Sequence, residues 1–123
     1  MNGARTPQAY DRDKLVELFG DDPATLAEVE REFLETARTA EREIKETDDF
    51  TAIARAAHRL KGASGMIGAT SLRQIAEAVE RAAKANDLPS VRRLHEMFSR
   101  EVDRVAEQVG VTERLVSQGV SSC

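Results

Sequence analysis

The sequence predicts an all-α fold, an antiparallel up-and-down four-helix bundle with a short additional N-terminal helix. In four long segments apolar residues recur at steps of three and four, which is the period of one helix face, and no segment shows the sustained alternation of a strand. The links between these segments are short, which favours antiparallel neighbours. A length of 123 residues fits one domain.

The first two helices are delimited by turn and capping residues. After a polar tail over residues 1–10, a short helix is expected over about residues 11–19 and ends at Gly20, because glycine tolerates the left-handed conformation. Its apolar face would comprise Leu15, Leu18 and Phe19. Asp22 and Pro23 then begin a helix that runs to about residue 46, since Asp caps free N–H groups and Pro suits the first turn. Its apolar face would comprise Leu26, Val29, Phe33, Ala37, Ala40 and Ile44.

The next two helices flank a glycine-rich stretch. Asp48 or Asp49 caps the third helix, which should fray within residues 62–68. Its buried face would comprise Phe50, Ile53, Ala54, Ala57, Leu60 and Ser64. Ser71 begins the fourth helix, with Gln74 three residues later as in a capping box. Its apolar stripe would comprise Leu72, Ile75, Ala76, Val79 and Ala83.

The last helix is predicted to begin after a break at Asn86 and to be capped by Asp87. Its apolar stripe would comprise Leu88, Val91, Leu94, Phe98, Val102, Val105 and Val109. Gly110 ends the pattern, so the domain is expected over residues 11–110. Residues 111–123 are expected to form a flexible tail, because they offer little to pack.

Composition and charge narrow the class of protein. Charged residues make up 33% of the chain and hydrophobic ones 41%, as in soluble globular domains. The net charge of −4 argues against a nucleic-acid binder. Cys123 alone forms no internal disulfide and excludes a site built from two to four cysteines. No segment reaches the length of a membrane span, and the first ten residues lack the apolar run of a secretory signal, so we expect a cytoplasmic protein.

The residues around His58 are the most informative stretch. At about 100° per residue, His58 lies at the edge of the buried face, where its imidazole can contact the bundle and still reach water. Lys61 follows at i+3 and leans back toward it, because helical side chains tilt toward the N-terminus. Gly62 removes a side chain that would project toward the imidazole. Gly62 and Gly65 each cost about 1 kcal/mol relative to Ala inside a helix, so access for a large group is a reason for them.

This arrangement fits phosphoryl chemistry. Neutral imidazole is a nucleophile near neutral pH, and transfer of a phosphoryl group depends mainly on positioning and charge stabilisation. Lys61, with Arg55 at i−3, supplies positive charge for phosphoryl oxygens. No carboxylate cluster with ligand spacing lies near His58, so we expect no resident cofactor and a Mg²⁺ ion supplied by the partner.

The segment resembles the motif of histidine-containing phosphotransfer domains, which reads approximately His-x-Leu-Lys-Gly-x-[Ser/Ala]-x-x-[apolar]-Gly. The matching residues are His58, Leu60, Lys61, Gly62, Ser64, Ile67 and Gly68. The resemblance covers about residues 11–109 and implies a four-helix bundle whose exposed histidine, here His58, carries the phosphoryl group. Lys61 would be its supporting charge, Gly62 the small residue beside it, and Glu77 or Glu80 a polar neighbour from the following helix. The implied partners are receiver domains of response regulators or hybrid histidine kinases.

Two other functions are weighed against phosphotransfer, and several further residues are considered for partner binding. A helical adaptor without phosphotransfer would be expected to lack His58 or Lys61, and a histidine-kinase dimerisation fragment typically has Glu after its histidine, where this chain has Arg59. A phosphocarrier without turnover of its own is therefore preferred to an enzyme. The residues considered for partner binding are Arg55, Arg59, Ser64, Met66, Glu77 and Glu80. His95 is expected at the surface without a role, and an acidic run comprising Glu28, Glu30, Glu32 and Glu35 is expected to be a solvated face.

Overall fold

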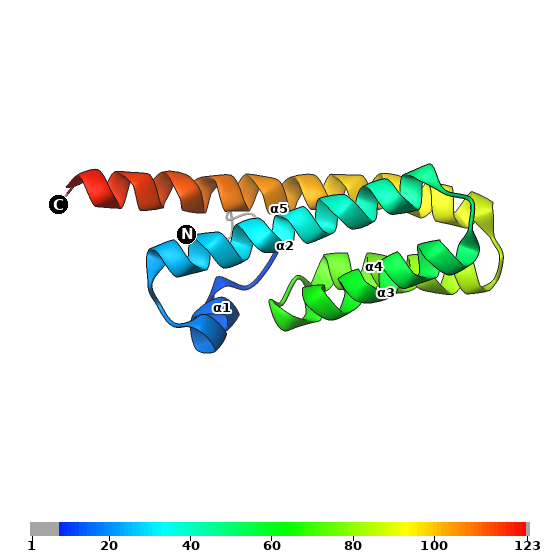
Figure 1. The fold of residues 1–123 in the computed structure, drawn as a ribbon, viewed down its shortest axis with the longest axis horizontal. Helices are drawn as coiled ribbons and strands as arrows, with labels where there is room; N and C mark the ends of the chain where they lie inside the picture. The colour runs from blue at the N-terminus through cyan, green and yellow to red at the C-terminus, as the bar shows by residue number, and fades with distance from the viewer. Residues whose placement is uncertain (1–7, 123) are drawn as a thin grey trace, which may run out of the picture.

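The computed structural model describes the backbone of residues 8–122 and the side chains of residues 8–111. Within this part of the chain the regular structure is helical throughout. The helices are α1 (Arg12–Phe19), α2 (Pro23–Glu46), α3 (Phe50–Met66), α4 (Thr70–Lys84) and α5 (Leu88–Ser122). Figure 1 shows α2 to α5 side by side, with the short α1 below the first turns of α2.

Successive helices of the bundle run in opposite directions. α2 packs on α3 and α5, and α4 packs on the same two helices, so α3 and α5 lie across the diagonal. In Figure 1 the α2–α3 and α4–α5 links lie at one end of the bundle, and α1 and the α3–α4 link lie at the other. The predicted antiparallel four-helix bundle with a short N-terminal helix is confirmed.

The core consists of aliphatic side chains and alanines, with few aromatic rings. Ile44, Ile53, Leu60, Val79 and Phe98 are fully buried at its centre. In the four long helices the predicted apolar faces match this core, apart from margin positions that are half-buried. These are Val29, Phe50, Ala54, Ile75, Leu88 and Leu94.

Aspartates cap most helix N-termini, as the sequence predicts. The Asp22 carboxylate accepts the N–H of Thr25 at 3.1 Å, and Asp49, rather than Asp48, accepts the N–H of Thr51 at 3.0 Å. Asp87 forms the same kind of cap on α5. A cap of this kind contributes about 1 kcal/mol, because it satisfies an N–H group that has no partner in the helix.

The α3–α4 junction differs from the prediction. α3 continues through the glycines at 62 and 65 to Met66 instead of fraying. Gly68, at φ +71°, then reverses the chain, and the Ala69 N–H donates to the Ser64 carbonyl at 2.9 Å. α4 begins at Thr70 without a side-chain cap, so the predicted capping box at Ser71 is wrong. The left-handed turn ends the link before Ser71 is reached, and the buried backbone bonds satisfy the chain there.

The predicted polar tail over residues 1–10 is wrong for its described part, residues 8–10. Ala9 and Tyr10 are buried. Gln108 of α5 holds this segment, since its side-chain oxygen accepts the Ala9 N–H at 2.8 Å and its Nε2 donates to the Tyr10 carbonyl at 3.2 Å. The Tyr10 hydroxyl donates to Glu30. So short a packed segment has no periodicity by which it could be recognised in the sequence.

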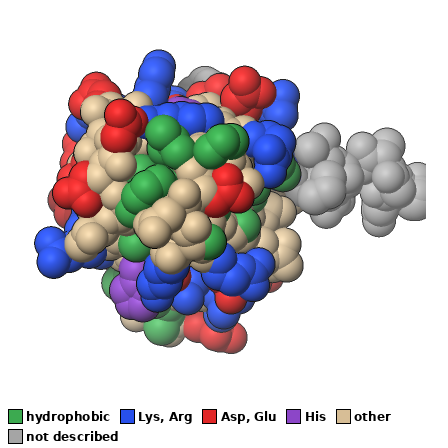
Figure 2. All heavy atoms as spheres, turned by 90° about the vertical axis from the view of Figure 1, so that its right-hand side faces the viewer, with side chains coloured by type: hydrophobic (Ala, Val, Ile, Leu, Met, Phe, Trp, Pro, Cys, Tyr) green, Lys and Arg blue, Asp and Glu red, His purple; other side chains and the backbone are tan. Residues whose placement is uncertain are grey.

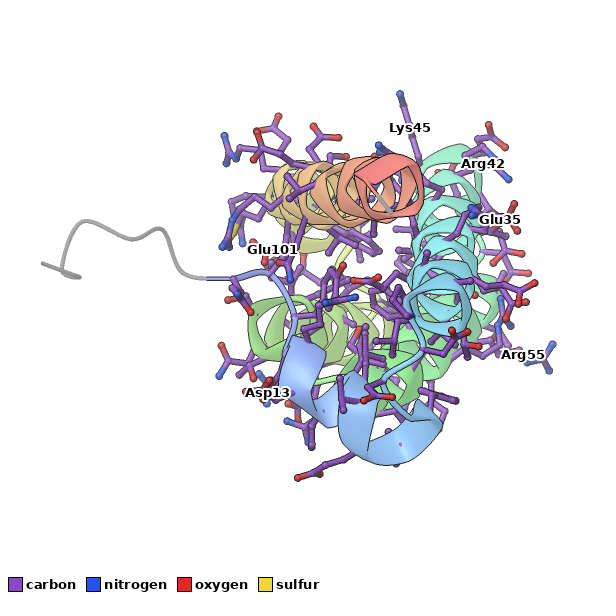
Figure 3. All side chains as sticks on the ribbon, turned by 90° about the vertical axis from the view of Figure 1, so that its left-hand side faces the viewer. Asp13, Glu35, Arg42, Lys45, Arg55 and Glu101 are labelled. Atoms are coloured by element: carbon purple, nitrogen blue, oxygen red, sulfur yellow. The ribbon has the colours of Figure 1, made fainter. Side chains whose placement is uncertain are left out.

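Burial of the N-terminal segment also changes two expectations for nearby side chains. Glu30 is buried at 1% exposure, whereas the other members of the predicted acidic face are exposed. In Figure 3 Glu35 points away from the bundle. Of the predicted apolar face of α1, Leu15 is buried, whereas Leu18 and Phe19 are exposed. The short α1 therefore packs on the bundle through Leu15.

α5 differs from the prediction in where it ends and in the burial of His95. The helix does not end at Gly110 but continues to Ser122, because a glycine with helical backbone angles weakens a helix by about 1 kcal/mol without ending it. The flexibility expected for residues 111–123 stays a prediction, and residues 1–7 and 123 lie outside the described range. His95 is half-buried rather than on the surface, and its Nε2 donates to the Glu41 carbonyl at 3.1 Å.

Candidate functional site

His58 lies in the middle of α3 at the rim of its buried face. Its neighbour Ala57 and the next-turn residue Leu60 are fully buried, whereas the His58 side chain is 69% exposed. The position of the ring follows from the helix period, because a residue one step from the centre of the buried face faces the boundary with solvent. The imidazole is therefore supported by the bundle on one side and open to water on the other.

Glu80 of α4 holds the imidazole from the protein side. Its Oε2 lies 3.1 Å from His58 Nδ1, and its side chain is only 9% exposed. Of the two carboxylates considered from the sequence, it is Glu80 and not Glu77 that contacts the ring. The choice depends on the rotation of α4 against α3, which the sequence alone does not define.

Two lysines neutralise the buried carboxylate of Glu80. Lys61 Nζ lies 3.2 Å from Oε1, and Lys84 Nζ lies 3.2 Å from Oε2. Lys84 was missed in the sequence, although its i+4 spacing from Glu80 on one helix is a usable signal. Lys61 was predicted to lean toward His58, and the structure shows that it reaches the same carboxylate that the imidazole contacts.

The charges around Glu80 determine its protonation. Burial alone raises the pKa of this carboxyl, but hydrogen bonds from Lys84 and Lys61 and the charges of both ammonium groups lower it, and the net result is a pKa below the ordinary value. Glu80 is therefore ionised at neutral pH. A buried carboxylate needs such partners, since an unpaired charge in a protein interior is costly.

The contact with Glu80 defines which nitrogen of His58 is available. An ionised carboxylate only accepts hydrogen bonds, so Nδ1 must carry the proton. In a neutral imidazole the other nitrogen then has a free lone pair. Nε2 is therefore the ring nitrogen whose lone pair is available for nucleophilic attack, and the side chain that carries it is 69% exposed.

The two predicted glycines have different surroundings. A Cβ atom added at Gly62 would meet no atom within 4 Å, so the bundle itself does not require glycine there. A Cβ atom at Gly65 would lie 3.4 Å from the side chain of Arg73 of α4, which is ordinary contact. Gly65 thus faces α4, and only Gly62 leaves open space on the solvent side of α3.

The residues considered for partner binding separate into exposed and buried ones. Ser64 is fully buried, as the helix period predicts, so its assignment to partner binding is wrong. Met66 is 57% exposed at the end of α3. Arg59 is exposed but pairs with Glu43 of α2, at 2.7 Å. Arg55 is exposed and points away from the bundle in Figure 3.

A cavity of about 740 Å³ lies directly beside His58, between the first half of α3 and the last half of α4. Its lining residues are Phe50, Thr51, Ala54, Arg55, His58, Arg59, Glu80, Ala83, Lys84 and Asn86. Figure 2 shows this end of the bundle, with Lys and Arg side chains gathered along its lower part. The imidazole is thus flanked by a basic hollow on one side and by the open surface at Gly62 on the other.

The described residues show neither a cluster of metal-binding side chains nor a membrane-spanning helix. Among the described side chains, no group of three or more His, Cys, Asp or Glu residues is placed to hold a metal ion. Within residues 8–122, no helix combines the length and the apolar character that crossing a bilayer requires.

Comparison with known proteins agrees with the fold and the motif. The chain has no significant match among curated proteins and none among solved structures. The family model of the Hpt domain matches residues 15–108, which covers the bundle from α1 to most of α5 and includes His58 with its surroundings. Members of this family are helical bundles that take part in histidine phosphotransfer. Because the match extends over more than half of the sequence, the chain belongs to the Hpt domain family.

Proposed function

We propose that this chain is a phosphorelay intermediate of a two-component signalling system, with His58 as its phosphoryl acceptor. The observation that carries the proposal is the 69% exposed side chain of His58, whose Nδ1 lies 3.1 Å from the buried, ion-paired Glu80. The partners are receiver domains of response regulators, or hybrid histidine kinases. Transfer to and from a receiver aspartate is reversible, because the same bonds form and break in both directions.

The transfer step uses the protonation state described above. The Nε2 lone pair attacks the phosphorus of a phosphoaspartate, the N–P bond forms, and the bond from phosphorus to the aspartate oxygen breaks, which leaves the carboxylate on the receiver. The imidazole keeps its proton on Nδ1 and becomes positively charged. The Glu80 carboxylate, 3.1 Å from Nδ1, stabilises that charge.

The two lysines supply positive charge on the protein side of the transferred group. Lys61 and Lys84 each end 3.2 Å from Glu80 in the unphosphorylated chain. Their flexible stems allow the ammonium groups to turn from Glu80 toward phosphoryl oxygens at Nε2. This positioning is consistent with the requirements of phosphoryl transfer, in which electrostatic stabilisation contributes most of the catalysis.

Several properties of the proposed carrier follow from its role. It accepts and donates the group without independent turnover, so it is a phosphocarrier and not an enzyme. The Mg²⁺ ion that such a transfer needs would come from the receiver. One histidine and one docking surface require a single copy, so we propose a monomer that acts in the cytoplasm, with no contact to nucleic acid or membrane.

The test is transfer of label from a phosphorylated receiver domain. We expect acid-labile, base-stable label on the wild-type chain and none on His58→Gln. His95→Gln is the matched control, because it changes the other histidine of the chain, 37 positions along, and should keep the label. Label retained by His58→Gln, or lost from both variants, would contradict the assignment of His58.

A second variant separates chemistry from mere presence of the acceptor. Lys61→Ala should slow transfer by about 10²-fold or less, since one stabilising charge is lost while the nucleophile remains. Circular dichroism checks that the bundle is intact. An unchanged transfer rate would remove Lys61 from the mechanism, and a bundle that never accepts label from any receiver would favour the adaptor or kinase-fragment alternatives.

A further inference from the structure

The cavity beside His58 has features that point to a particular kind of contact. We propose that this cavity receives an acidic segment of the receiver partner, an inference that rests on the proposed function. The segment would place an apolar side chain in the cavity and a neighbouring carboxylate against Arg55, which selects it. The segment would come from the surface of the receiver that surrounds its phosphorylated aspartate. The cavity therefore contributes specificity, while the imidazole contributes chemistry.

The cavity is basic although the chain is acidic. Its charged lining residues are Arg55, Arg59 and Lys84 against Glu80, within a chain of net charge −4. Because the chain as a whole repels an acidic partner, a local basic hollow beside the reactive histidine orients the approach of such a partner. A neutral or basic partner segment would gain nothing from this charge.

Arg55 is the cation in the cavity that is free to pair. Arg59 is already paired with Glu43 at 2.7 Å, and Lys84 is paired with Glu80 at 3.2 Å. Arg55 makes no hydrogen bond or ion pair with any other residue in the described part of the chain. Its guanidinium can bind a carboxylate with two parallel hydrogen bonds, a geometry that an ammonium group lacks.

The floor of the cavity decides between a protein segment and a small anion. Phe50, Ala54 and Ala83 give it an apolar surface between the charged residues. A free anion such as phosphate would leave that surface bare, whereas an apolar side chain next to a carboxylate covers the floor and reaches Arg55 at the same time. The cavity thus matches a side-chain pair on a protein surface.

The position of the cavity along α3 also defines how the partner lies. The cavity precedes His58 along the chain, toward Phe50, whereas the unobstructed surface at Gly62 follows His58 by one turn. A receiver that places one segment in the cavity and rests on Gly62 straddles the imidazole. Its aspartate is then centred on Nε2.

The experiment compares a phosphodonor that docks on the protein surface with one that does not. A phosphorylated receiver domain needs the docking surface, whereas phosphoramidate, a small donor, needs only His58 and its neighbours. Arg55→Glu should raise the KM for the phosphorylated receiver by about tenfold. Its rate of phosphorylation by phosphoramidate measures any direct effect of the Arg55 charge on the phosphoryl group, and this rate should fall by much less. Arg55→Lys should restore part of the loss, because it keeps the charge without the paired hydrogen bonds.

Arg100→Glu is the matched control, with the same charge change at an exposed position on α5, diagonally across the bundle from α3. It should leave the KM for the receiver near the wild-type value. The salt dependence gives a second readout. Added NaCl should slow receiver transfer to the wild-type chain more than to Arg55→Glu, since the variant has lost the screened interaction.

Two results would overturn the inference. Equal KM values for Arg55→Glu and Arg100→Glu would show only a general charge effect, and equal losses with both donors would show that Arg55 acts on the chemistry rather than on docking. Failure of the proposed function itself gives a different result. In that case the wild-type chain would take no label on His58 from either donor.

Discussion

At the scale of single residues, the site depends on how one carboxylate is shared. Glu80 contacts the imidazole of His58 and the ammonium groups of Lys61 and Lys84 within 3.2 Å. Removing a partner of a buried charge costs more than the pair contributes, because the remaining charge stays desolvated. The three contacts therefore form one unit, and a change at any of them alters the environment of the others.

Replacement of Glu80 by Gln should alter how stability depends on pH. The pKa of Glu80 is lowered in the folded chain from its ordinary value of 4.5. Between the folded and the unfolded pKa the unfolded chain binds more protons, so stability rises with pH. The contribution of Glu80 is complete above the unfolded pKa and is lost as the pH falls through the folded pKa. The destabilisation by Glu80→Gln should accordingly be largest near neutral pH and shrink in acid.

Urea unfolding of both chains between about pH 3 and pH 7 measures this difference. Glu77→Gln is the matched control, with the same substitution three residues earlier on α4, at a half-buried position. Parallel stability curves for wild type and Glu80→Gln over the whole range would contradict the electrostatic role of Glu80.

Sequence reasoning reached part of this site. His58, Lys61 and Gly62 stand on one helix, where the period alone defines their relative positions. The partner on α4 required the rotation between two helices, so Glu77 and Glu80 stayed alternatives, and Lys84 was found only through the carboxylate it neutralises. The relative positions of residues on one helix are thus predictable here, whereas the carboxylate that meets His58 from the neighbouring helix is not, and with it Lys84 was missed.

At the scale of elements, one arginine of α5 closes the end of α2. Arg92 donates to the carbonyls of Ile44 at 2.7 Å and Thr47 at 3.0 Å, and it pairs with Asp48 at 2.7 Å. These are the unpaired carbonyl groups that a helix leaves at its C-terminus, and a cation there is also favoured by the helix dipole. Arg92 thereby fixes the α2–α3 link to the last helix.

Replacement of Arg92 by Ala should destabilise the bundle by about 2–3 kcal/mol, because several hydrogen bonds to a charged group are lost and carbonyls lose their partner. The neighbouring Arg93→Ala is the comparison. Arg93 is exposed, and among the described residues its side chain donates to the Ser90 hydroxyl alone, at 2.9 Å. Its replacement by Ala should therefore cost less than about 1 kcal/mol. Denaturant unfolding measures the free energy of unfolding of both variants. Equal effects would show that the contacts of Arg92 with the end of α2 contribute little.

The elements themselves were largely predictable from the sequence, and the exceptions have a common cause. Local signals placed the starts of three helices at Asp22, at Asp48 or Asp49, and at Asp87, because caps act within a few residues. The start of α4 and the end of α5 were misplaced. The prediction at Gly68 and Gly110 used only the local preferences of glycine. In the structure, long-range packing and the backbone angles of these glycines determine where the helices begin and end.

At the scale of the whole molecule, the segment before α1 contacts three helices of the bundle, including the last one. Tyr10 is 1% exposed and donates to the buried Glu30 of α2, and the backbone around it is held by Gln108 of α5. The Asp11 N–H donates to the Ile67 carbonyl at 2.9 Å, at the end of α3. Three helices therefore meet on this short segment.

Truncation of this tyrosine should be costly for the entire fold. Tyr10→Ala should lower the free energy of unfolding by about 3–5 kcal/mol, since a large buried ring is lost. Tyr10→Phe should cost about 1–3 kcal/mol, because it removes only a donor to a buried carboxylate. Thermal and urea unfolding measure both. An effect of Tyr10→Ala below that of Tyr10→Phe would contradict the packing role.

The position of the site in the topology has an evolutionary consequence. His58, Lys61, Glu80 and Lys84 all belong to α3 and α4, which are consecutive and joined by a link of three residues. The reactive geometry is thus encoded in one helical hairpin of 35 residues from Phe50 to Lys84. Selection can retain this hairpin as a heritable unit while α1, α2 and α5 drift, so relatives that share the chemistry are expected to diverge most in the other three helices.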